Sequence, residues 1–322
     1  MRGASMKIVV MEPLGVAVEK IENLSAALKS AGHEFIYYTT KETQQDKLLA
    51  RVQDADIIML ANQPLNSDII NACPNLKMLS VAFTGVDHVA LDACRARKIM
   101  VCNAAGYSTN AVAELTFGLA ISVIRNIVPC DARCRNAETK DGLVGFELFG
   151  KTFGVVGTGA IGSRVAKIAA AFGCKVLAYS RTEKQELIGA GVKYVRLDAL
   201  LAQSDFVSLH VPLTDATRNL INAEAISKMK QGAVLLNTAR GGVVDSRALA
   251  DALNAGKLAG AGIDVFEGEP PIAKNHPLCS AKNTVLTPHV AFASREALEA
   301  RADIVFANIE KWLAGAPQNV VK

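Results

Sequence analysis

Residues 153–162 read FGVVGTGAIG, and this stretch decides the fold of the chain around it. The apolar run Phe153–Gly157 is typical of a buried β-strand, and it leads directly into the glycine loop GTGAIG. A helical pattern, Ala160–Phe172, follows the loop, and a second strand pattern, Lys175–Ser180, follows the helix. Strand, GxGxxG loop, helix and second strand in this order predict a dinucleotide-binding unit.

Each glycine of this loop has a physical task. The first permits a tight turn, the second lets a pyrophosphate approach the backbone, and the third allows the helix to pack closely on the strand. The helix N-terminus adds unpaired N–H groups and a partial positive charge. We therefore expect the pyrophosphate of a dinucleotide at Gly157, Gly159, Ala160, Ile161 and Gly162.

The end of the second strand predicts which dinucleotide binds. Many units of this kind carry Asp or Glu there, and the acid accepts hydrogen bonds from the adenosine ribose 2′-OH. This chain has Ser180, Arg181 and Thr182 instead. An arginine can pair with a 2′-phosphate that a carboxylate would repel. The sequence favours NADP(H), with NAD(H) also possible, over the alternative that Arg181 is only a solvated turn residue.

The rest of the chain continues the alternation of strands and helices. Apolar, β-branched runs such as Ile57–Leu60, Met78–Val81 and Ala233–Asn237 are separated by helical patterns, which predicts parallel sheets covered by helices. The nucleotide unit starts only near Lys151, so about half of the 322 residues precede it. We expect two α/β domains, the first of which is discontinuous because the last helix, Arg295–Leu313, returns to it.

The bulk composition excludes several classes of protein. Hydrophobic residues make up 50% and charged residues 20% of the chain, which predicts an ordered core. The net charge of +4 is spread out, so no nucleic-acid partner is expected. The longest apolar run, Ala111–Ile124, contains Glu114 and is too short for a membrane span. Seven cysteines without paired CxxC spacing, and no apolar leader after Met1, indicate reduced thiols in the cytoplasm and no metal site.

Three later strands end in chemically active residues. AVLLN runs into Arg240, GAGIDVF leads to Glu269 through Asp264, and TVLTPHV carries His289. The carboxyl ends of parallel strands face the ligand crevice of an open sheet. An arginine there can bind a carboxylate and polarise the adjacent carbonyl, a histidine can deliver a proton, and a glutamate can orient that histidine and favour its imidazolium form. Asp264 could hydrogen-bond the nicotinamide carboxamide or ribose. This set suits the reduction of a 2-oxo acid.

The stretches NTARGGVVDSRAL (237–249), GAGIDVFEGEPP (260–271) and TPHVAFAS (287–294) resemble the signatures of the D-isomer-specific 2-hydroxyacid dehydrogenases. With GTGAIG and HVPLTDATRNLI (210–221), the resemblance covers residues 80–313. It implies that the catalytic residues are Arg240, Glu269 and His289. It also implies further contacts to the cofactor, at His210, Val211, Pro212, Thr217, Thr238 and Ala239.

The resemblance also implies where the substrate binds. SVAFTGVDHVAL (80–91) is similar to a carboxylate-binding loop in which the N–H groups of Thr84, Gly85 and Val86 hold the acid. Tyr107, together with Arg240 and His289, is expected to face the substrate. The implied fold is a flavodoxin-like substrate-binding domain (1–104 plus 294–322) and a dinucleotide-binding Rossmann domain (105–293), with the active site in the interdomain cleft. A homodimer is implied as well.

These observations predict an NAD(P)-dependent reductase of small 2-oxo acids, such as glyoxylate or hydroxypyruvate, that forms (R)-2-hydroxy acids and catalyses the reverse oxidation. A nucleotide-sensing, corepressor-like protein on the same fold is one alternative. A D-3-phosphoglycerate dehydrogenase is another, which the lack of an obvious phosphate site near residues 80–88 and of a regulatory extension after Leu313 disfavours. Phe83 and Phe292 depart from the family pattern, and they either shape a less polar pocket or simply pack.

Overall fold

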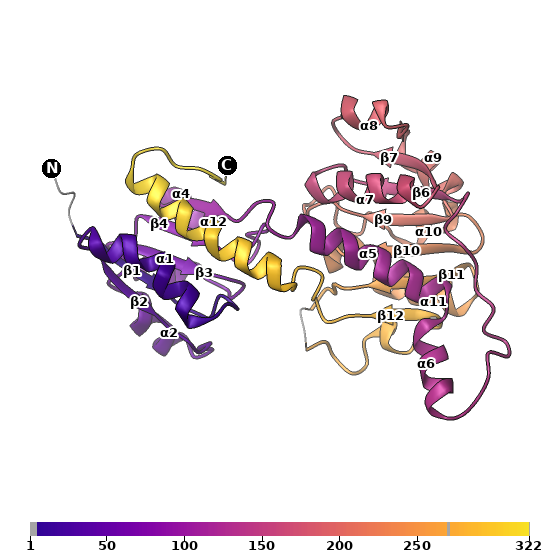
Figure 1. The fold of residues 1–322 in the computed structure, drawn as a ribbon, viewed down its shortest axis with the longest axis horizontal. Helices are drawn as coiled ribbons and strands as arrows, with labels where there is room; N and C mark the ends of the chain where they lie inside the picture. Colours follow the sequence, from indigo (N-terminus) through magenta and orange to yellow (C-terminus); the bar gives the residue numbers. More distant parts are fainter. Residues whose placement is uncertain (1–4, 269–270, 322) are drawn as a thin grey trace. The chain divides into compact units, whose positions relative to one another are not determined.

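The computed structural model describes residues 5–268 and 271–321, and the chain divides into two compact units. The first unit comprises Met1–Tyr107 and Ala293–Lys322, and the second comprises Ser108–Phe292. Each unit is built on its own parallel β-sheet with helices on both sides (Figure 1). The predicted α/β class with two parallel sheets is therefore confirmed.

The first unit contains a five-stranded sheet in the order β2-β1-β3-β4-β5, with every neighbouring pair parallel. This 2-1-3-4-5 order is that of the flavodoxin-like fold. The strands are β1 (Lys7–Val10), β2 (Glu34–Tyr37), β3 (Ile57–Leu60), β4 (Met78–Val81) and β5 (Met100–Asn103). The helices are α1 (Val18–Ser30), α2 (Gln45–Val52), α3 (Ser67–Asn71), α4 (Leu91–Ala96) and α12 (Arg295–Leu313).

Helix α12 joins the first unit although it lies at the other end of the sequence. Its first turn is capped by Ser294, whose hydroxyl accepts a hydrogen bond from the N–H of Ala297 at 3.1 Å. The helix then packs against α1, β4 and β5 and buries one apolar face that includes Val305 and Phe306. The predicted helix Arg295–Leu313 is confirmed, and its burial explains why it returns to this sheet.

The second unit contains a seven-stranded parallel sheet in the order β12-β11-β10-β9-β6-β7-β8. Counted from its first strand the order is 3-2-1-4-5-6-7, which is Rossmann topology with the reversal between β6 and β9. The strands are β6 (Thr152–Val156), β7 (Lys175–Tyr179), β8 (Lys193–Tyr194), β9 (Phe206–Leu209), β10 (Ala233–Asn237), β11 (Leu258–Ile263) and β12 (Thr284–Leu286). The helices are α5 (Thr109–Ile124), α6 (Ile127–Arg135), α7 (Ala160–Ala171), α8 (Gln185–Gly189), α9 (Leu197–Gln203), α10 (Ala223–Lys228) and α11 (Ser246–Asn254), with short 3₁₀ turns η1 (Gly241–Val243) and η2 (Pro277–Cys279).

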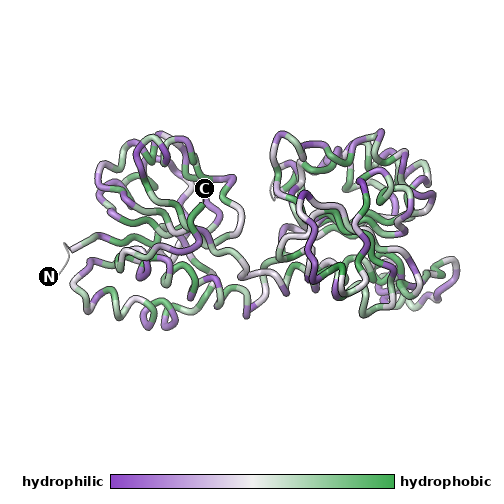
Figure 2. The backbone as a smooth tube through the Cα atoms, turned by 90° about the horizontal axis from the view of Figure 1, so that it is seen from above, coloured by the Kyte–Doolittle hydropathy of each residue, from purple (hydrophilic) through white to green (hydrophobic). Residues whose placement is uncertain are grey.

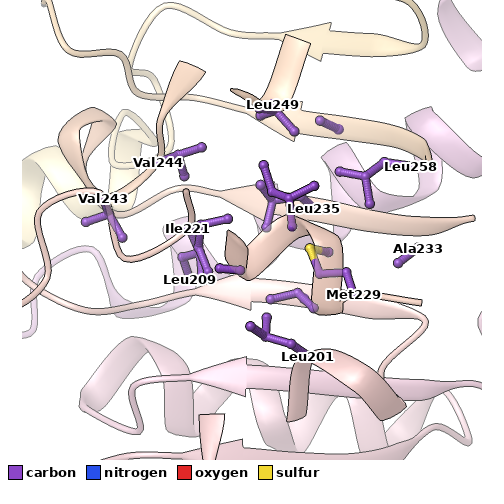
Figure 3. Close-up of a cluster of buried hydrophobic side chains, with 14 of the residues drawn as sticks. Leu201, Leu209, Ile221, Met229, Ala233, Leu235, Val243, Val244, Leu249 and Leu258 are labelled. Carbon is purple, nitrogen blue, oxygen red and sulfur yellow. The ribbon is translucent and has the colours of Figure 1, made fainter. Parts of the chain in front are cut away.

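Both faces of this sheet are covered, because alternate residues of its central strand enter different hydrophobic clusters. Leu235 belongs to the cluster drawn in Figure 3, together with Leu201, Leu209 and Leu249. Its neighbours Val234 and Leu236 belong to the cluster on the opposite face, which contains stacked phenylalanine rings. Side chains of successive strand residues point to opposite faces, so a strand buried on both sides is apolar at every position. Figure 2 shows hydrophobic stretches of the backbone within each unit.

Helix α5 lies directly on β11, because two glycines of that strand leave room for it. A Cβ atom at Gly260 would lie 2.5 Å from Val123 Cγ1, and one at Gly262 would lie 2.8 Å from Leu119 Cβ. In the described part of the chain no single helix is long and apolar enough to cross a membrane. Only α5 and α6 taken together, a pair bent by 61°, meet the length and composition requirement, and α5 is a largely buried core helix.

Candidate active site

The glycine loop has the shape that a pyrophosphate requires. Gly157 adopts a φ of +93°, and a Cβ atom there would lie 2.5 Å from the carbonyl oxygen of His210. A Cβ atom at Gly162 would lie 1.9 Å from the carbonyl oxygen of Gly157, whereas one at Gly159 would meet nothing within 4 Å. The first and third glycines are therefore required by the protein itself, and the second leaves open space beside the backbone. Because no side chain caps α7, the N–H groups of Ala160 and Ile161 begin the helix next to that space, which fits a bound phosphate.

The segment after β7 presents cationic side chains close to this loop. Arg181 and Thr182 are exposed, and Arg181 forms no hydrogen bond or ion pair within the residues that the structure describes. Lys184 donates a hydrogen bond from Nζ to Ser163 Oγ of α7 at 2.9 Å. Its backbone N–H is bound by the hydroxyl of Tyr194, which itself donates to Thr158 Oγ1 at 3.0 Å. The segment that carries Ser180 to Lys184 is thus fixed against the glycine loop.

The segment after β9 lies across the switch point from the glycine loop. His210 is half-buried, and its Nε2 atom lies 2.7 Å from Ser208 Oγ. Burial lowers the pKa of His210 to about 3, so the ring is neutral at physiological pH. Further along, the hydroxyl of Thr217 donates to the carbonyl of Pro212 at 2.6 Å and closes the turn after Val211. A neutral ring next to apolar side chains is a suitable surface for adenine.

The segment after β10 is locked by Asn237, a buried residue that the sequence reasoning missed. Its Oδ1 atom accepts from Ala239 N at 3.1 Å, and its Nδ2 donates to the carbonyl of Arg240 at 2.9 Å. The guanidinium of Arg240 donates to the carbonyl of Ala239 at 2.8 Å. Thr238 is anchored on α5 through a 3.0 Å contact between its Oγ1 and that of Thr116. The asparagine at the end of the strand was the available signal, because Asn stabilises such turns.

His289 is presented by a turn that Asp264 holds. The Asp264 carboxylate, which is fully buried, accepts hydrogen bonds from Thr287 Oγ1 at 2.6 Å, Val290 N at 2.9 Å and Ala291 N at 2.9 Å. The N–H of His289 donates to the carbonyl of Asp264 at 2.8 Å. His289 has a φ of +55°, a left-handed conformation that is uncommon for residues other than glycine, although less so for Asn, Asp and His. Three of roughly four acceptor positions of the Asp264 carboxylate are therefore occupied by the turn.

These segments gather at one edge of the sheet, because all seven strands run parallel and their carboxyl ends meet there. Gly241 allows the turn after Arg240 to lie directly against the segment that follows β11. A Cβ atom at position 241 would lie 1.8 Å from the carbonyl carbon of Phe266. The His289 turn follows β12, the neighbour of β11. The ring of Phe292 meets that of His289 edge-on, with centroids 5.6 Å apart. Glu269, predicted to orient the histidine, lies outside the described residues.

The first unit carries the predicted carboxylate-binding loop at the carboxyl end of β4. The carbonyl of Phe83 accepts from Ala104 N at 3.0 Å, and that of Thr84 accepts from Asn103 Nδ2 at 2.8 Å. Within the described residues, no hydrogen bond uses the N–H groups of Thr84, Gly85 or Val86. With its carbonyls engaged and its N–H groups available, the loop is suited to an anion.

Tyr107 lies close to this loop in the first unit. Its ring meets that of Phe83 edge-on, with centroids 6.0 Å apart, and both side chains are largely buried. The structure thus places the predicted residues in two sets. One set, from Gly157 to His289, follows the strands of the second sheet, and the other, from Thr84 to Tyr107, belongs to the first sheet.

A Rossmann sheet with an open phosphate loop at its switch point, and with an arginine and a histidine at the same edge, defines a nicotinamide-dinucleotide-dependent oxidoreductase. Residues 117–291 match the family described as D-isomer specific 2-hydroxyacid dehydrogenase, NAD binding domain. The chain belongs to the D-isomer-specific 2-hydroxyacid dehydrogenase family, which confirms the resemblance found in its motifs.

Relatives across the family align over most of the chain. A glycerate dehydrogenase of Methylorubrum extorquens is 39% identical over 312 residues, which cover 94% of this chain and 96% of the relative. A glyoxylate reductase of Thermococcus litoralis is 41% identical and covers 85% of this chain and 86% of its own. Among solved structures, an acyclic imino acid reductase in complex with NADPH and D-Arg has a TM-score of 0.89 at 30% identity, covering 98% of this chain and 100% of that one.

Proposed function

We propose that this protein reduces a small 2-oxo acid to the (R)-2-hydroxy acid with a reduced nicotinamide dinucleotide, and catalyses the reverse oxidation. One observation carries the proposal. A buried carboxylate, Asp264, fixes the turn that presents His289, and the Asn237-locked turn presents Arg240 at the same edge of the sheet. Relatives that are named for glycerate, glyoxylate and hydroxypyruvate support the same substrate class.

Each group has a definite chemical task in this reaction. A reduced nicotinamide, when bound, supplies the hydride to the carbonyl carbon. Arg240 binds the substrate carboxylate and polarises the carbonyl. His289 donates the proton to the developing alkoxide, and Glu269 is proposed to orient the imidazole. The N–H groups of Thr84, Gly85 and Val86 in the first unit are proposed to bind the substrate carboxylate as well.

We further propose that NADP(H) is preferred over NAD(H). Support comes from Arg181, which is exposed and has no ionic partner among the described residues, and from Lys184, which is fixed 2.9 Å from Ser163 in the first turns of α7. Both cations follow the strand whose end lies at the adenosine ribose in this fold. Position 180 is a serine, so the chain has no carboxylate there that would repel a 2′-phosphate.

A homodimer is proposed from the apolar surface of α6 and the segment after it. None of the residues of α6 is buried, and Ile127 and Val128 are 46% and 57% exposed. Val144 and Phe149 in the following segment are 87% and 75% exposed. Exposed apolar side chains at this density are typical of a subunit interface. Sedimentation of the Val128→Glu variant is expected to show monomers if a second copy covers this surface.

A cytoplasmic location stays a prediction.

The two alternatives are separated by the residues at the site. A phosphoglycerate substrate needs a cation for its phosphate, and residues 81–91 contain neither lysine nor arginine. A nucleotide-sensing protein needs no presented histidine, whereas here three hydrogen bonds to Asp264 fix the turn of His289. Both observations support the reductase.

The test is the oxidation of NADPH and NADH, followed at 340 nm, with a panel of 2-oxo acids. We expect turnover of glyoxylate or hydroxypyruvate, a higher kcat/KM with NADPH, and a fall in kcat of about 10²–10⁴-fold in the His289→Gln variant. A parallel panel that contains an amine tests whether the imino acid is reduced instead. NADPH binding without turnover of any acid would support the nucleotide-sensing alternative.

A further inference from the structure

Arg301, in the interior of the first unit, joins three segments that are far apart in the sequence. It lies on α12 and is 4% exposed. Its Nη2 and Nε atoms donate to the carbonyl of Leu14 at 2.7 Å and 3.3 Å, and its Nη1 donates to the carbonyl of Ala82 at 3.4 Å. Leu14 follows β1 and Ala82 follows β4, so the guanidinium connects the last helix with the carboxyl ends of two strands.

The guanidinium also lies against two aromatic rings. Its central carbon is 5.2 Å from the ring centroid of Phe83 and 6.0 Å from that of Tyr107. Burial lowers the pKa of Arg301, and Tyr107 and Glu12 oppose this shift. A buried charge is tolerated only where partners replace its water. The carbonyl groups and the ring faces are such partners, and they hold the guanidinium at a defined position.

From this position Arg301 contacts the first residues of the predicted carboxylate-binding loop. Three successive carbonyls, of Ala82, Phe83 and Thr84, accept hydrogen bonds from Arg301, Ala104 and Asn103. No hydrogen bond within the part of the chain that the structure describes uses the N–H groups of Thr84, Gly85 or Val86, so these backbone donors are left for a ligand. Arg301 holds the first of these carbonyls and packs under the ring of the second residue.

We propose that Arg301 is a positioning residue for substrate binding. It presets the N–H groups of Thr84, Gly85 and Val86, and its fixed positive charge behind the loop strengthens their attraction for the substrate carboxylate. The inference rests on the proposed function, because it assigns the loop to a 2-oxo acid. It adds a residue that takes no direct part in the chemistry.

The experiment compares Arg301→Met and Arg301→Lys with a matched control, Arg51→Met. Arg51 belongs to the same unit and is bound in a similar way, because its Nη1 donates to the carbonyls of Thr40 and Met11 and its guanidinium lies 4.4 Å from the Tyr38 ring centroid. It makes no contact with the loop 83–86 in the described structure. The readouts are KM for the 2-oxo acid, KM for NADPH, kcat and the melting temperature.

We expect Arg301→Met to raise KM for the 2-oxo acid by at least about tenfold, while KM for NADPH stays within about twofold. Arg301→Lys, which keeps the positive charge but places its donors on a single nitrogen, should recover part of this loss. Arg51→Met should lower the melting temperature and leave both KM values unchanged. If Arg301→Met does not fold, the same split between the two KM values is expected, in smaller measure, for Arg301→Lys.

Three results would overturn the proposal. They are an unchanged KM for the 2-oxo acid in Arg301→Met, equal rises of both KM values, and the same rise in Arg51→Met. If KM for the 2-oxo acid is as high in Arg301→Lys as in Arg301→Met, the positive charge does not contribute to substrate binding, and the electrostatic part of the proposal is wrong. A wild-type protein that turns over no 2-oxo acid refutes the proposed function, whereas an active wild type with an unaffected Arg301→Met variant refutes only the positioning role.

Discussion

Replacing Asp264 by asparagine tests how the histidine is presented. Asparagine has nearly the same volume, so the core around this fully buried side chain keeps its packing. One side-chain oxygen can still accept from Thr287 Oγ1 and Val290 N, as Oδ1 does now. The other position becomes an amide NH₂, which then faces the N–H of Ala291 at the present 2.9 Å. Two buried donors in contact repel each other.

The magnitude follows from the count of hydrogen bonds. A buried donor without an acceptor costs about 1–3 kcal/mol. For a unit of this size, each kcal/mol lowers the melting temperature by roughly 2–4 °C, so we expect a fall of about 2–12 °C. The turn also holds His289 at a φ of +55°, a conformation that costs about 1–2 kcal/mol and relaxes when the turn loosens. A displacement of about 1 Å at the imidazole lowers kcat by roughly 10²-fold.

The assay measures kcat, KM for NADPH and the melting temperature of Asp264→Asn beside Thr287→Val. The valine variant removes the hydroxyl bond but leaves both backbone N–H bonds to the carboxylate. It should therefore lose about 1.5–3 kcal/mol of stability and keep kcat within a few-fold. An Asp264→Asn variant with normal kcat and a raised KM for NADPH would refute the reasoning, because the carboxylate would then act on the cofactor itself.

Three further predictions concern the cofactor side of the second unit. Arg181→Ala is expected to raise KM for NADPH at least about tenfold, with little change in KM for NADH. Lys175→Ala, at the other end of the same strand, is the control and should change neither KM value. Equal effects of Arg181→Ala on both cofactors would contradict the assignment. Gly159→Ala should keep the wild-type melting temperature, because the added Cβ meets no protein atom within 4 Å, but it should weaken dinucleotide binding, because the Cβ enters the space expected for the pyrophosphate. Gly162→Ala should be less stable even without cofactor, because its Cβ would lie 1.9 Å from the carbonyl oxygen of Gly157. For His210, the folded pKa of about 3 lies below the ordinary 6.5, so the unfolded chain takes up the proton first and stability falls as pH drops from about 6.5 to about 3. His210→Gln should flatten that part of the denaturation profile, and identical slopes would contradict the assignment.

The central strands could be predicted from the sequence, and the strands it missed lie at sheet edges. Ile57–Leu60, Met78–Val81 and Ala233–Asn237 appear in the structure with the predicted bounds, because strands that are buried on both faces are uninterrupted apolar runs. The missed strands are β2, β5 and β8, each of which ends a sheet. An edge strand is partly exposed and short, so its composition resembles that of a loop.

The residues of the candidate site were likewise only partly predicted from the sequence. The glycines and the residues with obvious chemistry, such as Gly157 and His289, could be named from the sequence because their residue type itself indicates a role. Those roles stay predictions. Arg301 was missed because its partners are backbone carbonyls far away in the sequence, which the sequence pattern does not reveal. Asn237 was missed although its partners, Ala239 and Arg240, lie only two and three residues away. The assignment of Asp264 to the cofactor stays a prediction, and the structure adds that its carboxylate accepts three hydrogen bonds from the turn of His289, which the sequence did not reveal.

Buried polar side chains therefore shape this protein's ligand-facing edges. Asn237, Asp264 and Arg301 each form hydrogen bonds with carbonyls or amides of a loop at the end of a strand, and these bonds restrain the loop. An unsatisfied partner in the core would cost about 1–3 kcal/mol, which is why each arrangement persists without a ligand. The groups at these edges to which we assign the chemistry are the N–H groups beside Gly85, the imidazole of His289 and the guanidinium of Arg240. Preorganisation of this kind means that substrate binding does not have to order the site first.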